Sequence, residues 1–201
     1  MNGNGFEHAC FISYKHPPKT APPNHFYREF AIHFQKVLER HLSTPIRSYL
    51  DENADIGSAY PEDLSRRLCR SVCMIAILVP EYPDSNWCAA EWAAMEKLET
   101  KRLGGNRGLI LPIALKRSAD DWNRLYQRKP ADFSKVAVPA NQLESVKQVQ
   151  KIQAIAAKIE ALVTQVHETC EDCTQFMLTI GEEKLNPTPT FTDPSLFERS
   201  R

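Results

Sequence analysis

A chain of 201 residues with 42% hydrophobic content can bury one substantial core, so we expect one domain with an appendage rather than two domains. Its 25 basic and 25 acidic side chains balance, which argues against nucleic acid and anionic membranes as default partners. The six scattered cysteines do not resemble a secreted disulfide framework, and neither a membrane-spanning stretch nor a signal peptide is visible, so we expect a cytoplasmic protein.

The first part of the chain alternates between strand and helix patterns. Residues 9–14 form a compact strand candidate that runs into two prolines, which cannot continue strand pairing. Apolar positions recur at helical spacing over residues 25–42, and residues 46–50 indicate a second strand. A polar loop at residues 51–58 then leads to a helix with Pro61 in its first turn, where proline is favourable.

The middle of the chain continues this alternation. Residues 72–79 contain no polar side chain, which is typical of a central parallel strand covered on both faces. A helix is predicted from about residue 87 to residue 101, and the glycines at 104 and 105 would end it. Residues 109–115 form another apolar strand, in which Pro112 predicts a peripheral position or a bulge.

The last part of the domain is less regular. Residues 116–132 are weakly patterned, residues 135–138 are a candidate for a short final strand, and residues 146–166 indicate a long amphipathic helix. About five alternations of strand and helix predict an α/β fold with an open, doubly wound parallel sheet. We divide the chain into a leader (1–8), a domain (9–167) and a C-terminal tail (168–201), which either packs, stays disordered or docks a partner.

No metal site is expected. His25, His33 and His41 are eight residues apart, which separates them by more than two helical turns, too far to share one ion. A triplet of His167, Cys170 and Cys173 would need a further ligand and is a weak metal signal.

Glu91 is an unusual residue for its place on the helix predicted at 87–101. At roughly 100° per residue it lies about 60° from Cys88 and about 40° from Met95, within the stripe that should be buried. A buried carboxylate needs compensation. Either backbone donors near the helix start satisfy it, or it faces a cleft in which a developing positive charge does so.

Three segments together resemble the Toll/interleukin-receptor (TIR) domain over roughly residues 8 to 167. They are residues 9–16, the loop 51–61, and the motif Ser85-x-Trp87-Cys88-x-x-Glu91. The resemblance implies a flavodoxin-like sheet of five parallel strands. It also implies that the loop gates a cleft and mediates assembly, and that Glu91 matches the glutamate with which enzymatic members cleave NAD.

The resemblance also implies where substrate would lie. The nicotinamide side of the pocket would come from Ser13, Tyr14 and Lys15, while His16 departs from the basic residue often found there. The gating loop would contribute Asp51, Ile56 and Gly57. Trp87 and Cys88 are further candidates for substrate contact, although we expect them mainly to pack the base of the helix.

A single carboxylate suits the chemistry that the resemblance implies. The leaving nicotinamide departs as a neutral molecule, so no general acid is needed, whereas a typical glycosidase needs two carboxylates. We therefore expect an NAD⁺ glycohydrolase or ADP-ribosyl cyclase, with NAD⁺ as substrate and no other cofactor. It would self-associate through TIR contacts, bind an activating partner through residues 168–201, and act in bacterial antiphage immunity.

Two other classes of function compete with this hypothesis. A non-enzymatic TIR adaptor would act only by binding other TIR domains, and the carboxylate of Glu91 argues against it because such members tend to lack one. A flavin-binding domain on the same fold is disfavoured because Lys15-His16-Pro17-Pro18 offers no hydroxyls or glycines to hold a phosphate.

Overall fold

The computed structural model describes residues 5–18, 20–22, 25–50, 60–116, 119–136 and 143–166. Five parallel strands form one sheet in the order β2-β1-β3-β4-β5. The strands are β1 (His8–Tyr14), β2 (Arg47–Leu50), β3 (Ser71–Leu78), β4 (Ile110–Ala114) and β5 (Ala131–Asp132). The helices are α1 (Phe26–His41), α2 (Tyr60–Cys69), α3 (Asn86–Leu103), α4 (Ala119–Tyr126) and α5 (Val146–Gln165).

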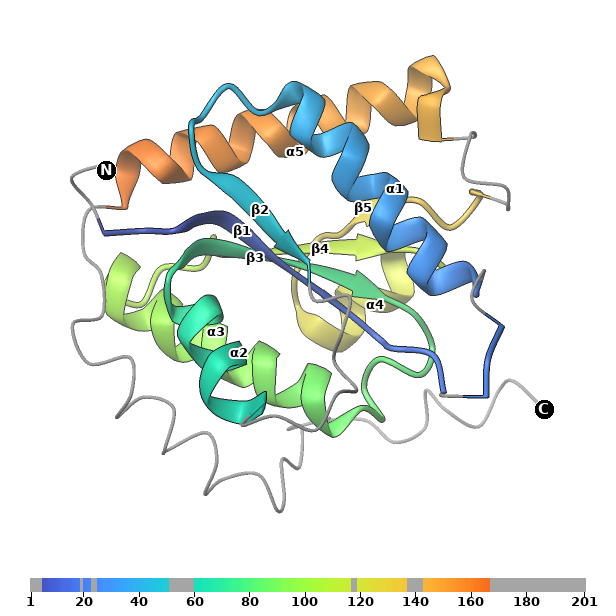
Figure 1. Cartoon of the computed structure of the whole chain (residues 1–201), viewed down its shortest axis with the longest axis horizontal. Coiled ribbons are helices and arrows are strands. Elements are labelled where there is room, and N and C mark those ends of the chain that lie inside the picture. The colour runs from blue at the N-terminus through green and yellow to red at the C-terminus, as the bar shows by residue number, and fades with distance from the viewer. Residues whose placement is uncertain are drawn as a thin grey trace.

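Helices cover both faces of the sheet, as the alternation of strand and helix patterns predicted. Helices α1 and α5 pack together on one face, α2 and α3 lie on the other, and α4 flanks the β4 side (Figure 1). All eight residues of β3 are buried, because this strand lies in the middle of the sheet and between both helical layers. The doubly wound parallel sheet is therefore confirmed.

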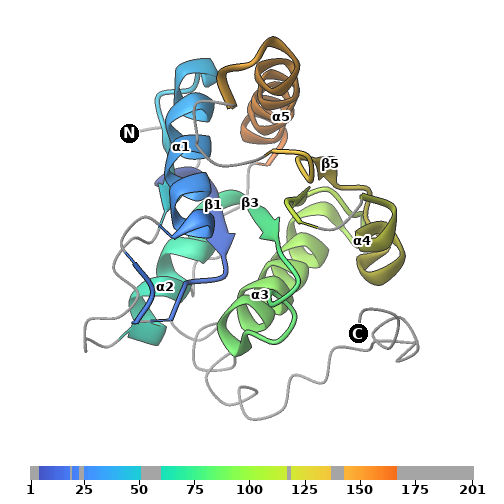
Figure 2. The ribbon, with the colours of Figure 1, turned by 90° about the vertical axis from the view of Figure 1, so that its right-hand side faces the viewer.

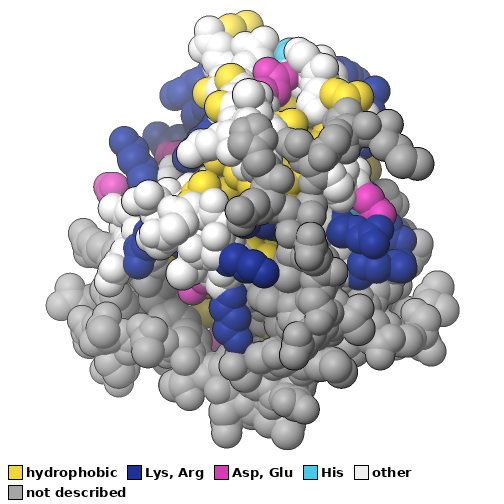
Figure 3. All heavy atoms as spheres, turned by 90° about the vertical axis from the view of Figure 1, so that its left-hand side faces the viewer, with side chains coloured by type: hydrophobic (Ala, Val, Ile, Leu, Met, Phe, Trp, Pro, Cys, Tyr) yellow, Lys and Arg dark blue, Asp and Glu magenta, His cyan; other side chains and the backbone are white. Residues whose placement is uncertain are grey.

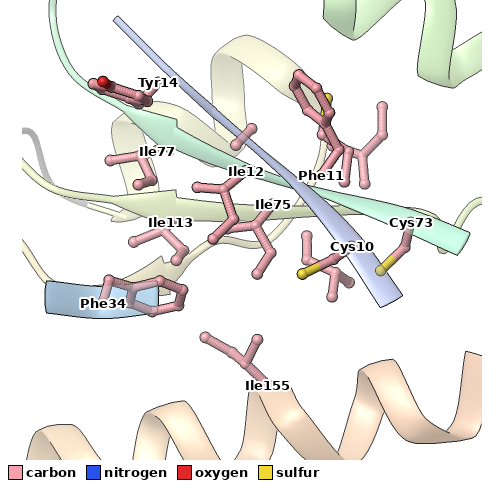
Figure 4. Packing of buried hydrophobic residues seen from close by; sticks show 14 of the residues in the cluster. Cys10, Phe11, Ile12, Tyr14, Phe34, Cys73, Ile75, Ile77, Ile113 and Ile155 are labelled. Carbon is pink, nitrogen blue, oxygen red and sulfur yellow. The ribbon is translucent and has the colours of Figure 1, made fainter. Parts of the chain in front are cut away.

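Alternation along β1 decides which of its side chains face each helical layer. Ile75 and Ile113 of the sheet lie above Phe34 of α1 and Ile155 of α5, while Phe11 points to the opposite side (Figure 4). Because side chains two residues apart on a strand share a face, Ser13 lies on the same side as Phe11, toward α2 and α3. The strand thus presents a hydroxyl to the layer that carries Glu91.

Two arginines join neighbouring elements at the end of the sheet where the strands begin. Arg70, directly before β3, forms an ion pair with Glu7 before β1. The Arg102 guanidinium, near the end of α3, donates to the carbonyl oxygen of Ser71 at 2.7 Å and lies 4.9 Å from the centre of the Phe6 ring. Figure 3 shows this side of the molecule, where some Lys and Arg side chains lie against Asp and Glu side chains and others among uncharged atoms. The two arginines therefore tie neighbouring elements together.

Two expectations about β4 and the segment after it were wrong. β4 is an inner strand without a bulge, because Pro112 stays in register opposite Ala76, and β5 begins pairing only at Ile113. Among the described residues, no strand pairs with Pro112 on the β5 side, so its missing N–H costs no hydrogen bond there. In the part of the chain that the structure describes, the strand after β4 lies at Ala131–Asp132, and Lys135 and Val136, the described part of the strand expected at 135–138, belong to a turn. A helix, α4, occupies part of the weakly patterned stretch.

Candidate functional site

The candidate site lies where the direction of the chain across the sheet changes. After β1 the chain moves outward to β2, whereas after β3 it moves the other way to β4 and β5. In open parallel sheets, ligands bind beyond the carboxyl ends of the strands at this switch point. Figure 2 views that edge, with β1 and β3 ending side by side above α3.

Local sequence fixes where α3 begins and ends at this edge. Two turns follow β3, in which the Tyr82 amide donates to the Val79 carbonyl at 2.9 Å and the Ser85 amide donates to the Tyr82 carbonyl at 3.2 Å. Ser85 then caps the helix, because its Oγ accepts a hydrogen bond from the Cys88 amide at 3.4 Å. Gly104 ends the helix at φ 60°, a conformation that glycine adopts without strain.

Glu91 faces the sheet from the second turn of α3. It is only 9% exposed and lies on the stripe with Cys88, Met95 and Leu98, so the expected buried face is confirmed. Ser13 Oγ donates to Glu91 Oε2 at 2.5 Å. The carboxylate is therefore compensated in part by a hydroxyl from β1, a partner that spacing along the helix could not reveal.

A buried tyrosine completes this hydrogen-bonded group. Tyr82 Oη lies 2.7 Å from Ser13 Oγ, and both residues are 1% exposed. Burial, followed by the charges of Cys88 and Glu91, raises the pKa of the Tyr82 phenol well above its ordinary value. Tyr82 therefore stays protonated at neutral pH and can donate a hydrogen bond.

Cys88 lies beside the same group and remains a thiol. Burial, with the Glu91 charge adding to it, raises the pKa of Cys88 to about 12, although hydrogen bonds from Ser85 and Ser13 and the charge of Lys15 oppose the shift. A thiol with so high a pKa is a poor nucleophile. Among these side chains, Glu91 is thus the one suited to stabilise positive charge, and the half-buried Lys15 ammonium is near enough to influence the site.

The other candidate residues near the end of β1 and the start of α3 differ in how far they are buried. The Tyr14 ring is 3% exposed and stacks on His16 with ring centres 4.3 Å apart, which gives His16 a packing partner. Cys88 packs beneath α3 as expected, but Trp87 does not, since it is 42% exposed. Trp87 occupies the first turn of α3, at the helix end that begins beyond the strand ends, so its ring reaches solvent.

Several predicted features lie outside the described residues. They are the loop candidates Asp51, Ile56 and Gly57, the triplet His167, Cys170 and Cys173, and the tail 168–201.

A second buried group holds the far half of α3. The Glu99 carboxylate accepts from the Leu109 amide at 2.7 Å and from Arg128 Nη2 at 2.6 Å, and the side chains of Glu99 and Arg128 are 4% and 7% exposed. The Arg128 guanidinium also lies 5.6 Å from the ring centre of Trp92, the residue after Glu91. This group joins α3 to the start of β4 and to the loop before β5.

The sequence patterns did not indicate Tyr82 or Arg128 as buried partners of α3, for different reasons. Tyr82 lies in a proline-containing loop, where no periodicity applies and no local pattern indicates a buried side chain. Arg128 belongs to the weakly patterned stretch. The acidic residues Asp120 and Asp121, with Trp122 and Tyr126 four residues apart, could have indicated α4 and placed Arg128 just after it.

Comparison with known proteins identifies the family. Residues 10–150, well over half of the chain, match the family described as TIR domain. The comparison with curated proteins gives no match. None of the described helices has the length and apolar character that a membrane span requires. The match, together with the five-stranded parallel sheet flanked by helices, shows that this chain belongs to the TIR domain family.

Proposed function

We propose that this TIR domain cleaves the bond between nicotinamide and ribose in NAD⁺, with Glu91 as its catalytic residue. The observation that carries the proposal is the buried Glu91 carboxylate at the ends of β1 and β3, which accepts a hydrogen bond from the Ser13 hydroxyl at 2.5 Å. A carboxylate in such a place can interact strongly with positive charge that develops beside it.

The reaction needs no general acid from the protein, because the leaving group departs as a neutral molecule. As the bond from ribose C1′ to the pyridinium nitrogen breaks, its electron pair goes to the nitrogen, and nicotinamide leaves as a neutral molecule. The ribose becomes cationic at C1′, and the Glu91 carboxylate would stabilise that charge and orient the ribose hydroxyls. Water attacking C1′ gives ADP-ribose, whereas attack by a nucleophile within the same molecule gives a cyclic product.

We further propose that the site is completed by assembly. The relevant loop, residues 51–61, and the tail 168–201 would supply the contacts to a second copy and to an activating partner. The exposed Trp87 at the start of α3, next to the site, supports an interaction at this edge. In this proposal the protein is a cytoplasmic effector of antiphage defence whose activity depends on association.

The same exposed tryptophan also favours the second candidate, a non-enzymatic adaptor that acts by binding other TIR domains. In that case the Ser13 to Glu91 hydrogen bond would only fasten α3 to the sheet. The two candidates differ in whether any product is formed.

Product analysis tests the proposal directly. The purified full chain is incubated with NAD⁺, with and without a crowding agent, and the products are separated by chromatography. We expect nicotinamide together with ADP-ribose or a cyclic isomer, in larger amounts with the crowding agent. Absence of nicotinamide under all conditions, including high protein concentration, would favour the adaptor.

A further inference from the structure

The hydroxyl that holds Glu91 is itself held. Ser13 Oγ lies 2.5 Å from Glu91 Oε2 and 2.7 Å from Tyr82 Oη, so three side chains from β1, α3 and the loop before α3 form one line of hydrogen bonds. Ser13 and Tyr82 are each 1% exposed, so bulk solvent does not reach either hydrogen bond. The group is therefore a fixed part of the fold.

Counting protons gives the direction of both hydrogen bonds. An ionised carboxylate only accepts, so Ser13 must use its single proton for Glu91. The Ser13 oxygen then accepts a hydrogen bond from the Tyr82 phenol, which stays protonated because burial raises its pKa. The Cys88 thiol also lies near Ser13, but a neutral sulfur competes weakly for the hydroxyl proton.

We propose that Tyr82 is a positioning residue for Glu91, because its phenol orients the Ser13 hydroxyl and Ser13 in turn holds one carboxylate oxygen in place. The proposal rests on the proposed function, since it assigns Tyr82 a part in NAD⁺ cleavage without contact to substrate. Chains of hydrogen bonds polarise one another, so the phenol strengthens the bond from Ser13 to the carboxylate.

The backbone holds Tyr82 in the turns that link β3 to α3. Its amide is bonded within the turn after β3, to the Val79 carbonyl at 2.9 Å. The phenol is thus held by the turn that follows β3, so it can orient the Ser13 hydroxyl toward Glu91.

Other titratable groups surround this line of hydrogen bonds. Lys15 follows β1, Cys88 lies on α3, and Tyr126 of α4 acts on the Tyr82 phenol through its charge. Burial raises the pKa of Cys88 and of Tyr126 well above neutral, so neither changes charge in the range in which a carboxyl titrates. Glu81 and Asp84, in the same loop as Tyr82, also carry carboxyls, so a change in the acid limb of the rate profile is assigned to Glu91 by carbon-13 NMR of its own carboxyl.

Kinetics of Tyr82→Phe, Ser13→Ala and the double variant test the proposal. Tyr82→Phe keeps the ring and removes only the hydroxyl. We expect kcat to fall about tenfold, because that ratio corresponds to the free energy of one hydrogen bond to a charged group. We expect KM for NAD⁺ to stay within about twofold of the wild type, because Tyr82 does not contact substrate. The acid limb of the rate profile should move to higher pH, because the anion loses support. The double variant should equal Ser13→Ala, because Tyr82 acts only through Ser13.

The matched control is Tyr27→Phe, which removes a nearby hydroxyl that bonds Glu81 and should leave kcat and the pH profile unchanged. Wild-type kcat and an unmoved acid limb in Tyr82→Phe would overturn the proposal, as would effects of the two single variants that multiply in the double variant.

A readout without turnover separates this proposal from the proposed function. If the wild type releases no nicotinamide, NAD⁺ cleavage fails, but carbon-13 NMR of the Glu91 carboxyl still reports its protonation. We then expect a higher protonation midpoint in Tyr82→Phe than in the wild type, with Tyr27→Phe unchanged. Identical midpoints in the wild type and Tyr82→Phe would overturn the positioning role by itself.

Discussion

The buried pair of Glu99 and Arg128 offers a sharp test of how α3 is anchored. We consider Arg128→Met, which removes the charge and keeps a long apolar side chain beside the Trp92 ring. The substitution deletes the hydrogen bonds of 3.0 Å and 2.6 Å from the guanidinium to the two oxygens of Glu99. The carboxylate, 4% exposed, would keep its backbone donors at Gly108 and Leu109.

These contacts set the size of the effect. Removing one partner of a buried ion pair costs about 3 to 5 kcal/mol, because the other charge stays buried without compensation. Since two backbone amides still stabilise the Glu99 carboxylate, we expect the lower end, about 3 kcal/mol at pH 7. Combining Arg128→Met with Glu99→Gln should recover part of this loss, because no charge then remains buried while the amide oxygen still accepts from the backbone.

The pH dependence follows from the pKa of Glu99. Burial acts to raise the pKa of this carboxyl, but hydrogen bonds from Arg128, Gly108 and Leu109 with the Arg128 charge outweigh it and hold the pKa below 4.5. The unfolded chain therefore binds this proton at higher pH than the folded protein. The stabilisation is fully present above about pH 4.5 and is lost as the pH falls through the pKa of Glu99 in the folded protein. The free energy of unfolding of Arg128→Met should therefore decrease less on acidification than that of the wild type.

Urea unfolding followed by circular dichroism, at several pH values from neutral to acidic, measures these effects. A loss below about 1 kcal/mol in Arg128→Met at pH 7 would refute the buried-pair argument. The argument would also be refuted if the double variant lost as much unfolding free energy as the two single variants together, because the effects of substituting two residues in contact should not add.

Two further predictions concern the site and its assembly. With its pKa raised to about 12, the buried Cys88 should stay unlabelled by N-ethylmaleimide at pH 7 until urea unfolds the protein, and rapid labelling of the native protein, located by mass spectrometry, would contradict its burial. Specific activity should rise with protein concentration over about a hundredfold range, because assembly favours the closed site. Replacing Ile56 and Gly57 by bulky charged residues should remove that rise and leave the circular dichroism spectrum unchanged. Constant, high activity from a species that light scattering shows to be a monomer would rule assembly out.

Much of the fold could be predicted because its signals are local. The unbroken apolar run of β3 required a strand covered on both faces, and the stripe of Cys88, Glu91 and Met95 required α3 to bury a carboxylate. Ser85 and Gly104 mark the two ends of that helix by side-chain and backbone preferences that operate within one turn. Such features need no knowledge of distant residues.

The errors and omissions arise where distant segments decide the outcome. Pro112 sits in an inner strand only because β5 is two residues long and starts pairing at Ile113, which no local pattern reveals. Tyr82 reaches Ser13 across 69 residues of sequence, so its role emerges only when the loop after β3 folds over β1. Trp87 is apolar in type but exposed, because its position at a helix end outweighs its hydrophobicity.

The central claim is that the Glu91 carboxylate performs the chemistry, and the rate of nicotinamide release by Glu91→Gln tests it most directly. The matched control is Glu96→Gln, the same substitution on α3 at a half-buried residue whose contact is Arg128. With both variants folded by circular dichroism, we expect Glu91→Gln to lose at least about a hundredfold in rate, as removal of one electrostatic stabiliser does, and Glu96→Gln to stay near the wild type. Release of nicotinamide by folded Glu91→Gln at the wild-type rate would contradict the account.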